Sequence, residues 1–260
     1  MTNAAPVAVR RDGAIAWLAL NRPQALNALD VAAATALDAA LADLSRDPGL
    51  RALVLHGTGR AFCAGGDLHA MRADPLPVAR ALIEPLHSAL RRLDALAVPV
   101  LACVHGQVAG AGVSLMLACD LAIAADDCAF NLAYVNVGAS CDGSASWHLP
   151  RVVGLRRALE IALLGETFGA AEALRLGLVN RVVPAAALAA ETERLARRLA
   201  AGPTRALGEM RRLLRDAPQR TLDAQLDAER EAFLRCTATD DFRGALDAFA
   251  AKAPPAFAGH

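Results

Sequence analysis

The chain has 260 residues, and its 27 Lys and Arg residues balance 27 Asp and Glu residues. This balance gives no reason to expect nucleic acid or an anionic membrane as the main partner. The six cysteines form no CxxC pair and mostly stand in apolar segments, so we expect free thiols in a reducing compartment. The first 13 residues have no long apolar segment behind a basic start, so we expect no secretory signal and a cytoplasmic location.

The N-terminal part of the sequence predicts strands around one helix. Apolar segments at 7–10 and 15–20 flank the turn sequence RDG, a combination typical of a hairpin. Helical spacing follows over 30–44, with Asp30 as the predicted N-cap, and 52–56 reads as a buried strand. The order up to this point is strand, strand, helix, strand.

Two passages of strand, small-residue loop and helix come next. The first has the loop FCAGGDL at 62–68 and a helical period over 78–96, and the second has a strand at 99–104 and a helix beginning near Gly110. Small residues let a ligand approach the unpaired N–H groups of such loops and helix starts. Two loops of this kind, with Ala64 and Ala111, can hold a developing oxyanion between two N–H donors.

No charged side chain lies between Asp94 and Asp120, a length that could cross a bilayer. Polar residues and glycines, such as His105 and Gln107, interrupt this segment in its middle. A buried strand followed by a turn and a helix explains the same apolarity without lipid. We therefore expect no membrane insertion.

The remainder of the chain becomes helical. A strand is predicted at 120–125 and a last extended segment at 130–137, followed by a polar turn at 139–150 that contains Asp142. From 155 the pattern is helical except at 177–184, and it gives apolar stripes near 185–201, 203–214, 221–234 and 240–251. Such helices cap a core or form an oligomer surface.

Five motifs in this order resemble the crotonase (enoyl-CoA hydratase/isomerase) superfamily. They are LNRPQALNAL at 20–29, GRAFCAGGDL at 59–68, HGQVAGAGVSLMLACDLAIA at 105–124, LPRVVGLRRALEIALLGE at 149–166 and GLVNRVV at 177–183. The resemblance implies an α/β fold in which 1–195 form a spiral of repeated ββα units with the acyl-CoA site. It implies that 196–260 form a helical region for capping and for assembly into a homotrimer or a dimer of trimers. Coenzyme A would be part of the substrate, with no separate cofactor, and we expect no metal because the histidines lack ligand spacing.

The resemblance also implies roles for single residues. It places the two oxyanion-hole amides on Ala64 and Ala111, in agreement with the loops. The positions that line the CoA and acyl groups are Gln24, Ala25, Leu26, Gly65, Gly66, Asp67, Leu68, Gly110, Ser114, Tyr134 and Lys252. Gln24 stands where a basic residue is common. Lys252 could face CoA from its own or a neighbouring subunit.

Departures from the family pattern bear on the chemistry. Ser114 and Tyr134 occupy the positions at which hydratases carry two glutamates that activate water. Neither side chain is a competent base near neutral pH. Asp142 is the one acid left in this region, and it matches an aspartate of dienoyl-CoA and epoxyphenylacetyl-CoA isomerases. The resemblance therefore implies an enoyl-CoA isomerase in which Asp142 shuttles a proton.

Alternatives remain at this stage. Asp142 could instead serve as a turn residue or the N-cap of the next helix. It could alone position water in an enoyl-CoA hydratase, or act as a nucleophile as in aryl-CoA dehalogenases. The chain could also bind acyl-CoA without turnover, since fold alone does not imply activity. Trp147 and His148 are expected to serve packing, and Arg211-Arg212 is expected to lie on a solvated helix face.

Overall fold

The computed structural model describes residues 5–260, so the first four residues of the segment that bears on secretion lie outside it. Its strands form two sheets. In spatial order the first contains β1 (Val7–Asp12), β2 (Ile15–Leu20), β3 (Ala52–Gly57), β5 (Val100–Val104), β7 (Leu121–Ala125) and β10 (Arg181–Val183). The second contains β4 (Ala61–Cys63), β6 (Gln107–Ala109), β8 (Ala129–Asn131) and β9 (Phe168–Gly169). The predicted hairpin is confirmed, because β1 and β2 pair antiparallel.

From β3 to β8, consecutive strands alternate between the sheets. β3, β5 and β7 pair in parallel in the first sheet, and β4, β6 and β8 do so in the second. Helices follow each pair: α2 (Leu68–Met71) and α3 (Pro75–Ala95) after β4, α4 (Ala111–Ala118) after β6, and η2 (Val135–Val137), α5 (Ala145–Val153) and α6 (Leu155–Leu164) after β8. This repetition is the ββα spiral implied by the sequence resemblance.

Two local predictions were wrong. Gln107–Ala109, expected as part of a turn, is strand β6, because it pairs with β4 on one side and β8 on the other. The extended segment expected over 130–137 stops at Asn131, and Val135–Val137 form a 3-10 turn. The Asn131 side chain ends the strand, since its Oδ1 accepts from the Ala133 N–H at 2.6 Å.

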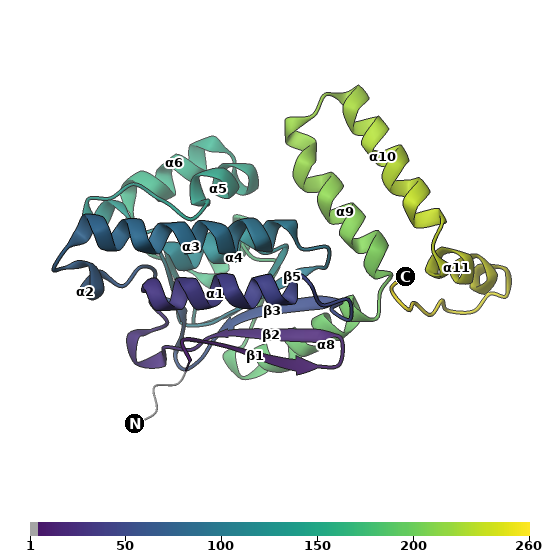
Figure 1. Ribbon diagram of the computed structural model, residues 1–260. Helices are drawn as coiled ribbons and strands as arrows, with labels where there is room; N and C mark the ends of the chain where they lie inside the picture. The colour runs from purple at the N-terminus through teal and green to yellow at the C-terminus, as the bar shows by residue number, and fades with distance from the viewer. Residues whose placement is uncertain (1–4) are drawn as a thin grey trace.

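Helices cover both faces of the first sheet. α1 (Val31–Leu44) and α3 lie side by side on one face, and α8 (Leu188–Ala200) packs against the other (Figure 1). Asp30 caps α1 as predicted, because its carboxylate accepts from the Ala33 N–H. Fully buried side chains such as Leu18, Leu53 and Leu101 fill the interior. The remaining short elements are η1 (Pro23–Ala25), α7 (Ala170–Arg175), η3 (Ala185–Ala187) and η4 (Ala217–Gln219).

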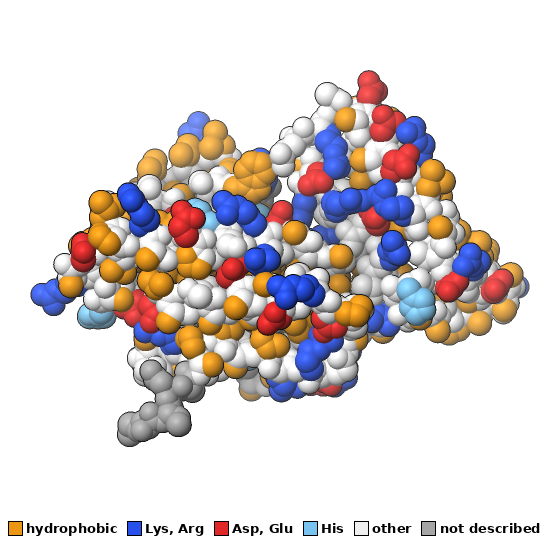
Figure 2. All heavy atoms as spheres, in the orientation of Figure 1, with side chains coloured by type: hydrophobic (Ala, Val, Ile, Leu, Met, Phe, Trp, Pro, Cys, Tyr) orange, Lys and Arg blue, Asp and Glu red, His pale blue; other side chains and the backbone are white. Residues whose placement is uncertain are grey.

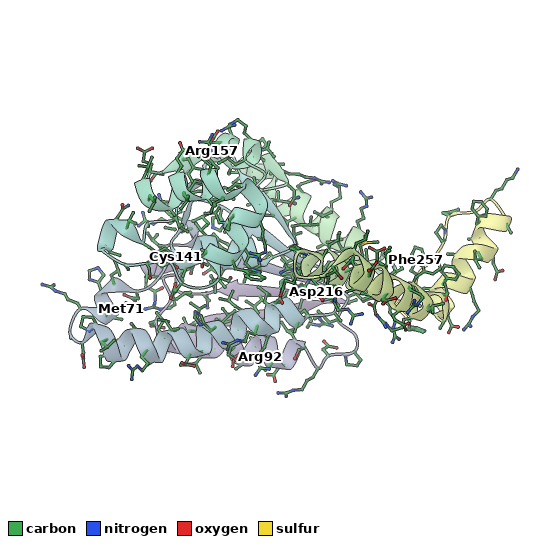
Figure 3. All side chains as sticks on the ribbon, turned by 90° about the horizontal axis from the view of Figure 1, so that it is seen from above. Met71, Arg92, Cys141, Arg157, Asp216 and Phe257 are labelled. Carbon is green, nitrogen blue, oxygen red and sulfur yellow. The ribbon has the colours of Figure 1, made fainter. Side chains whose placement is uncertain are left out.

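The last helices form an arm beside the core. α9 (Thr204–Asp216), α10 (Leu222–Thr237) and α11 (Asp240–Ala250) extend away from the sheets in Figure 1. In the view from above, Asp216 and Phe257 lie toward this arm, whereas Met71 and Cys141 lie at the other end of the core (Figure 3). The division expected at residue 195 falls inside α8, which still packs on the sheet, so the chain leaves the core between α8 and α9.

Large apolar side chains remain exposed on two parts of the surface, visible as orange groups over α6 and along the arm in Figure 2. On α6 they are Leu155, Leu159, Leu163 and Leu164, and on the arm they are Leu214, Leu222, Leu226, Phe233, Leu234, Leu246 and Phe249. Phe249 is 84% exposed. Single exposed leucines are ordinary, but clustered ones mark surfaces that contact another molecule.

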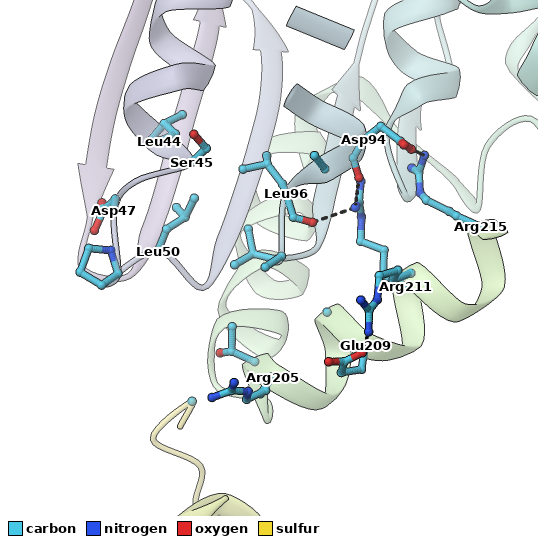
Figure 4. A pocket seen from close by; sticks show the side chains of 18 of the residues that line it. Leu44, Ser45, Asp47, Leu50, Asp94, Leu96, Arg205, Glu209, Arg211 and Arg215 are labelled. Atoms are coloured by element: carbon cyan, nitrogen blue, oxygen red, sulfur yellow. Dashed lines mark hydrogen bonds and ion pairs between the residues drawn. The ribbon is translucent and has the colours of Figure 1, made fainter. Parts of the chain in front are cut away.

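Charged contacts join the arm to the core. Arg211 on α9 donates to both carboxylate oxygens of Asp120 at 2.8 Å, and it also reaches the carbonyl of Leu96 (Figure 4). Arg215, one turn later, binds Asp120 and Asp94. The Arg211 side chain is 7% exposed, so its predicted place on a solvated face was wrong. The partner carboxylates come from distant parts of the chain.

No helix among residues 5–260 has the length and apolar character needed to cross a membrane. The apolar segment between Asp94 and Asp120 consists of β5, β6 and α4 instead.

We expect Asp120→Ala to destabilise the protein by about 3 kcal/mol, because it leaves two arginines without their carboxylate in a largely buried setting. Urea unfolding followed by circular dichroism measures this change. The matched control is Asp43→Ala, which breaks the exposed pair with Arg46 and should cost under about 0.5 kcal/mol. Equal effects of the two variants would contradict the anchoring role of Asp120.

Candidate active site

A cavity of about 470 Å³ lies between the loop after β4, the N-terminus of α4, helices α2 and α3, and the segment that carries Asp142. It brings together Ala64, Gly65, Gly66, Leu68, Gly110, Ala111, Tyr134 and Asp142 from the predicted set. Its other lining residues are Leu29, Met71, Ala79, Leu82, Ile83, Leu86, Ala133, Val137, Ala139 and Ser140. The cavity is therefore apolar, with one carboxylate in its wall.

The N-terminus of α4 presents its first amide to this cavity. Gly110 precedes the helix at φ 49°, a left-handed value that favours glycine. The N–H groups of Val113 and Ser114 both donate to the Gly110 carbonyl, at 3.0 and 3.3 Å, whereas the Ala111 N–H has no acceptor within residues 5–260. A Cβ on Gly112 would lie 2.2 Å from the Cys63 carbonyl oxygen. Glycine is thus needed there for α4 to begin directly against β4.

The loop after β4 lies beside this helix start. Gly65 has φ +98°, and a Cβ on it would lie 3.1 Å from the Ala109 oxygen and 3.5 Å from the Ala111 nitrogen. Burial raises the pKa of the Cys63 thiol to about 12, and a hydrogen bond with the Gly65 backbone opposes that rise. The Gly66 N–H donates to no acceptor in the described part of the chain. Gly66 and Ala111 therefore offer the two open amides.

The expectation that Ala64 offers its amide was wrong for this structure. The Ala64 N–H donates to the Leu26 carbonyl at 3.0 Å. Leu26 and Asn27 both have positive φ, and this turn brings the Leu26 carbonyl to the loop. Ala64 still lines the cavity, but its donor is already used.

Two residues that the sequence pattern did not single out, Asn27 and Arg22, hold these loops together. Asn27 is 1% exposed, accepts from the Arg22 N–H, and donates to the carbonyls of Thr58 and Ala61 at 2.9 and 2.7 Å. Arg22 forms an ion pair with Asp67 at 3.0 Å. The available signal was an Asn in a loop, since Asn tolerates left-handed backbone and bonds to nearby peptide groups.

Several residues predicted to contact CoA lie outside the cavity wall. The Asp67 carboxylate caps α2 through the Ala70 N–H. Burial tends to raise the pKa of Asp67, but that hydrogen bond and Arg22 together lower it. Gln24 is exposed on η1, and Ala25 and Leu26, which follow it, are partly buried. Lys252 is exposed just after α11 and does not line the cavity, so its contact with CoA stays a prediction.

Asp142 lies in a turn held by two hydroxyl groups. The Tyr134 O–H donates to Asp142 Oδ1 at 2.5 Å, and Ser114 Oγ donates to the Asp142 carbonyl at 3.0 Å. Gly143 and Ser144 follow with φ +61° and 72°. The N-cap position of α5 is Ser144, without a side-chain cap, so Asp142 does not cap this helix. Asp142 lines the cavity instead.

Tyr134 and Ser114 differ in their access to the cavity. Tyr134 lines the wall, whereas Ser114 is 1% exposed and lies beneath the turn. Burial raises the pKa of the Tyr134 phenol above its usual range, and the nearby Asp142 carboxylate raises it further. Tyr134 therefore remains a protonated donor to Asp142.

Other polar groups lie elsewhere. His148 and Trp147 line a separate cavity of about 600 Å³ between α5 and α9. Burial, and then the charge of Arg215, lowers the pKa of His148 to about 4. The larger cavity of about 680 Å³ on the other side of α9, shown in Figure 4, contains none of the predicted site residues. Residues 5–260 contain no cluster of three potential metal ligands.

The geometry suits a specific kind of chemistry. Two N–H groups without acceptors, on residues that line an apolar cavity, can stabilise negative charge on a carbonyl oxygen. A carboxylate in the same cavity can take up a proton and release it. Together they can remove a proton next to a carbonyl and stabilise the enolate that results.

Comparison with known proteins places the chain in one family. The family described as Enoyl-CoA hydratase/isomerase matches residues 10–260. The chain is 39% identical over 246 residues to the 1,2-epoxyphenylacetyl-CoA isomerase of Escherichia coli, covering 93% of this chain and 94% of that protein. It is 30% identical to the short-chain-enoyl-CoA hydratase of Clostridium acetobutylicum, covering 95% of each. The crystal structure of an enoyl-CoA hydratase from Polaromonas sp. JS666 superposes with a TM-score of 0.90 at 35% identity, covering 96% of this chain and 99% of that one. The chain belongs to the enoyl-CoA hydratase/isomerase family, within the crotonase superfamily.

Proposed function

We propose that this protein is an enoyl-CoA isomerase that moves a double bond in an unsaturated acyl-CoA by proton transfer. The observation that carries the proposal is that Asp142 supplies the one carboxylate among the residues lining the cavity into which the Gly66 and Ala111 amides open. One carboxylate and an enolate-stabilising site suffice for an allylic proton shift.

In the proposed mechanism the thioester oxygen accepts hydrogen bonds from the Gly66 and Ala111 N–H groups. Asp142 removes a proton from a carbon of the β,γ-unsaturated chain, and the electron pair of that C–H bond moves toward the thioester oxygen as a dienolate. Asp142 then returns the proton to the carbon at the other end of the dienolate, so the double bond shifts and the carboxylate is regenerated. The reaction consumes neither water nor a cofactor.

Hydration is the alternative outcome, because relatives of both kinds are similar to this chain. The isomerase reading is favoured by the groups at the two glutamate positions. Ser114 is buried under the turn, and the Tyr134 hydroxyl is already bonded to Asp142. Neither position therefore supplies a second carboxylate that could orient and deprotonate a water molecule.

The cavity also indicates the kind of acyl group. The wall contributed by α2 and α3 consists of aliphatic side chains, including Met71, Leu82 and Leu86. An acyl group that is uncharged at its far end fits this lining, because an unpaired charge there would lose its hydration. Coenzyme A enters as part of the substrate, and the mechanism requires no further cofactor.

We expect Asp142→Asn to lower isomerisation by about 10²-fold or more, since it keeps the side-chain shape and removes the base. Coupled absorbance assays with positional isomers of an enoyl-CoA, together with calorimetric binding of a saturated acyl-CoA, measure rate and affinity separately. Affinity should remain within about threefold, because the amides are unchanged.

The wild-type product ratio decides between the two reactions. With substrate deuterated at the carbon that loses its proton, a shuttle on Asp142 should return part of the label to the product in ordinary water. A hydroxyacyl product whose formation survives Asp142→Asn would contradict both the reaction and the catalyst assigned here. Binding without either product would identify a non-catalytic homologue.

Ala111→Pro tests the oxyanion site, because proline fits the first position of a helix and removes only the N–H. We expect kcat to fall about 10²- to 10³-fold. The Ala64→Gly variant, which keeps the amide that donates to Leu26, serves as the control and should fall much less. Unchanged turnover in a folded Ala111→Pro protein would remove Ala111 from the site.

We also propose that the arm forms the contacts of a homotrimer or a dimer of trimers. The exposed apolar residues on α10 and α11 support this assignment, since a monomer would leave them in water. Sedimentation velocity at micromolar concentration should show the trimer or its dimer, and Phe249→Asp should shift it toward monomer. Wild-type protein that sediments only as a monomer would exclude this assembly.

A further inference from the structure

Two hydroxyl groups from different elements meet at Asp142. The Tyr134 O–H reaches Oδ1 at 2.5 Å and lies 3.4 Å from the Asp142 carbonyl oxygen. Ser114 Oγ donates to that carbonyl at 3.0 Å and is 3.4 Å from the Tyr134 oxygen. Asp142 Oδ2 accepts no hydrogen bond from residues 5–260. The carboxylate is therefore held on one side and open on the other.

We propose that Ser114 and Tyr134 act as a hydroxyl clamp, in which Tyr134 is the positioning residue that leaves Asp142 with one working oxygen, Oδ2. The proposal rests on the proposed role of Asp142 as the proton carrier. Ser114 and Tyr134 stand at the positions of the two water-activating glutamates. In this proposal they position a single base, Asp142, and do not hold a water molecule.

The packing leaves the clamp little freedom. A Cβ on Gly143 would lie 3.1 Å from the Ser114 Cβ and 3.2 Å from its Oγ, so the turn rests directly on α4. The same helix supplies the Ala111 amide, which fixes the distance between oxyanion donor and turn. No other charged side chain lines the cavity, and α3 faces it with Leu82, Ile83 and Leu86. Tyr134 is thus the one titratable group beside Asp142 in this wall.

The clamp has a chemical consequence. If only Oδ2 can accept a proton, removal and return occur from one side of the bound chain, so the shift is suprafacial. The second oxygen cannot turn toward the substrate without breaking the bond to Tyr134. A carboxylate that swings freely would spend part of its time out of reach, which lowers kcat more than substrate binding.

Tyr134 is the only tyrosine in the sequence, so its phenol can be followed as one signal. In protein containing ¹³Cζ-tyrosine, nuclear magnetic resonance should show a phenol that stays protonated at pH 10.5, where an ordinary tyrosine with pKa of about 10 is mostly ionised. In Asp142→Asn the phenol should titrate at lower pH than in wild type, because the neighbouring negative charge is gone. Identical titration in both proteins would overturn the contact.

Kinetics test the positioning role. Tyr134→Phe removes only the hydroxyl, and we expect kcat to fall about tenfold or more while KM changes less than about threefold. Ser114→Ala should give a smaller fall of the same type, because Ser114 holds the backbone and not the carboxylate. The control is Thr35→Val, which removes an exposed hydroxyl that donates to the Val31 carbonyl on α1 and should leave kcat unchanged.

The outcomes separate the two proposals. Unchanged kcat in folded Tyr134→Phe, in an active isomerase, overturns the clamp and leaves the proposed function in place. Absence of isomerisation in wild type, with the Tyr134 titration still dependent on Asp142, overturns the proposed function and keeps the contact. Melting temperature and acyl-CoA affinity of each variant identify any loss that comes from misfolding.

Discussion

The close approach of two backbone segments, the start of α4 and the loop after β4, is the constraint on which the site depends. Gly112 lies so near Cys63 that a Cβ would come within 2.2 Å of its carbonyl oxygen. Gly65, in the loop after β4, packs against the backbone of Ala109 and Ala111 at the start of α4. A Cβ at Gly112 would clash and the φ of Gly65 favours glycine, so the open amides of Gly66 and Ala111 lie on two closely packed segments. Rigid placement of this kind lets an oxyanion site act without reorganising during the reaction.

The segment that carries Asp142 is hydrogen-bonded to the same helix. Ser114 belongs to α4, and its hydroxyl donates a hydrogen bond to the Asp142 carbonyl in the turn. Ser144, in this turn, has a positive φ, a value that non-glycine residues adopt at a cost of about 1–2 kcal/mol. Its buried Oγ has no partner within residues 5–260. The surrounding contacts must offset this local cost, as is common where a turn holds a functional group.

The arm is held by a different kind of force from the core. Apolar burial stabilises the sheets and α1, α3 and α8, whereas α9 meets the core through Arg211, Arg215 and Asp120. Directional bonds fix the angle of α9 without requiring a large apolar contact. The apolar residues of α10 and α11 consequently remain available on the surface. This division is compatible with a core that holds the site and an arm that contacts another subunit.

Local pattern determined much of this protein. Apolar periodicity identified β1, β2, α1 and the C-terminal helices. The apolar residues of each element recur at helical or alternating spacing, and this spacing can be read from neighbouring residues in the sequence. The small residues around Ala111 indicated an open helix start, and the resemblance to the crotonase superfamily singled out Asp142. Only the tertiary structure decided that the Ala64 amide is used by Leu26 and that Gly66 offers the open donor. Only the tertiary structure likewise decided that Arg211 donates a hydrogen bond to Asp120 and that Tyr134 donates one to Asp142. Each of these bonds joins residues from separate elements, and the partner of a hydrogen-bonding group is set by how those elements pack and not by its neighbours along the chain.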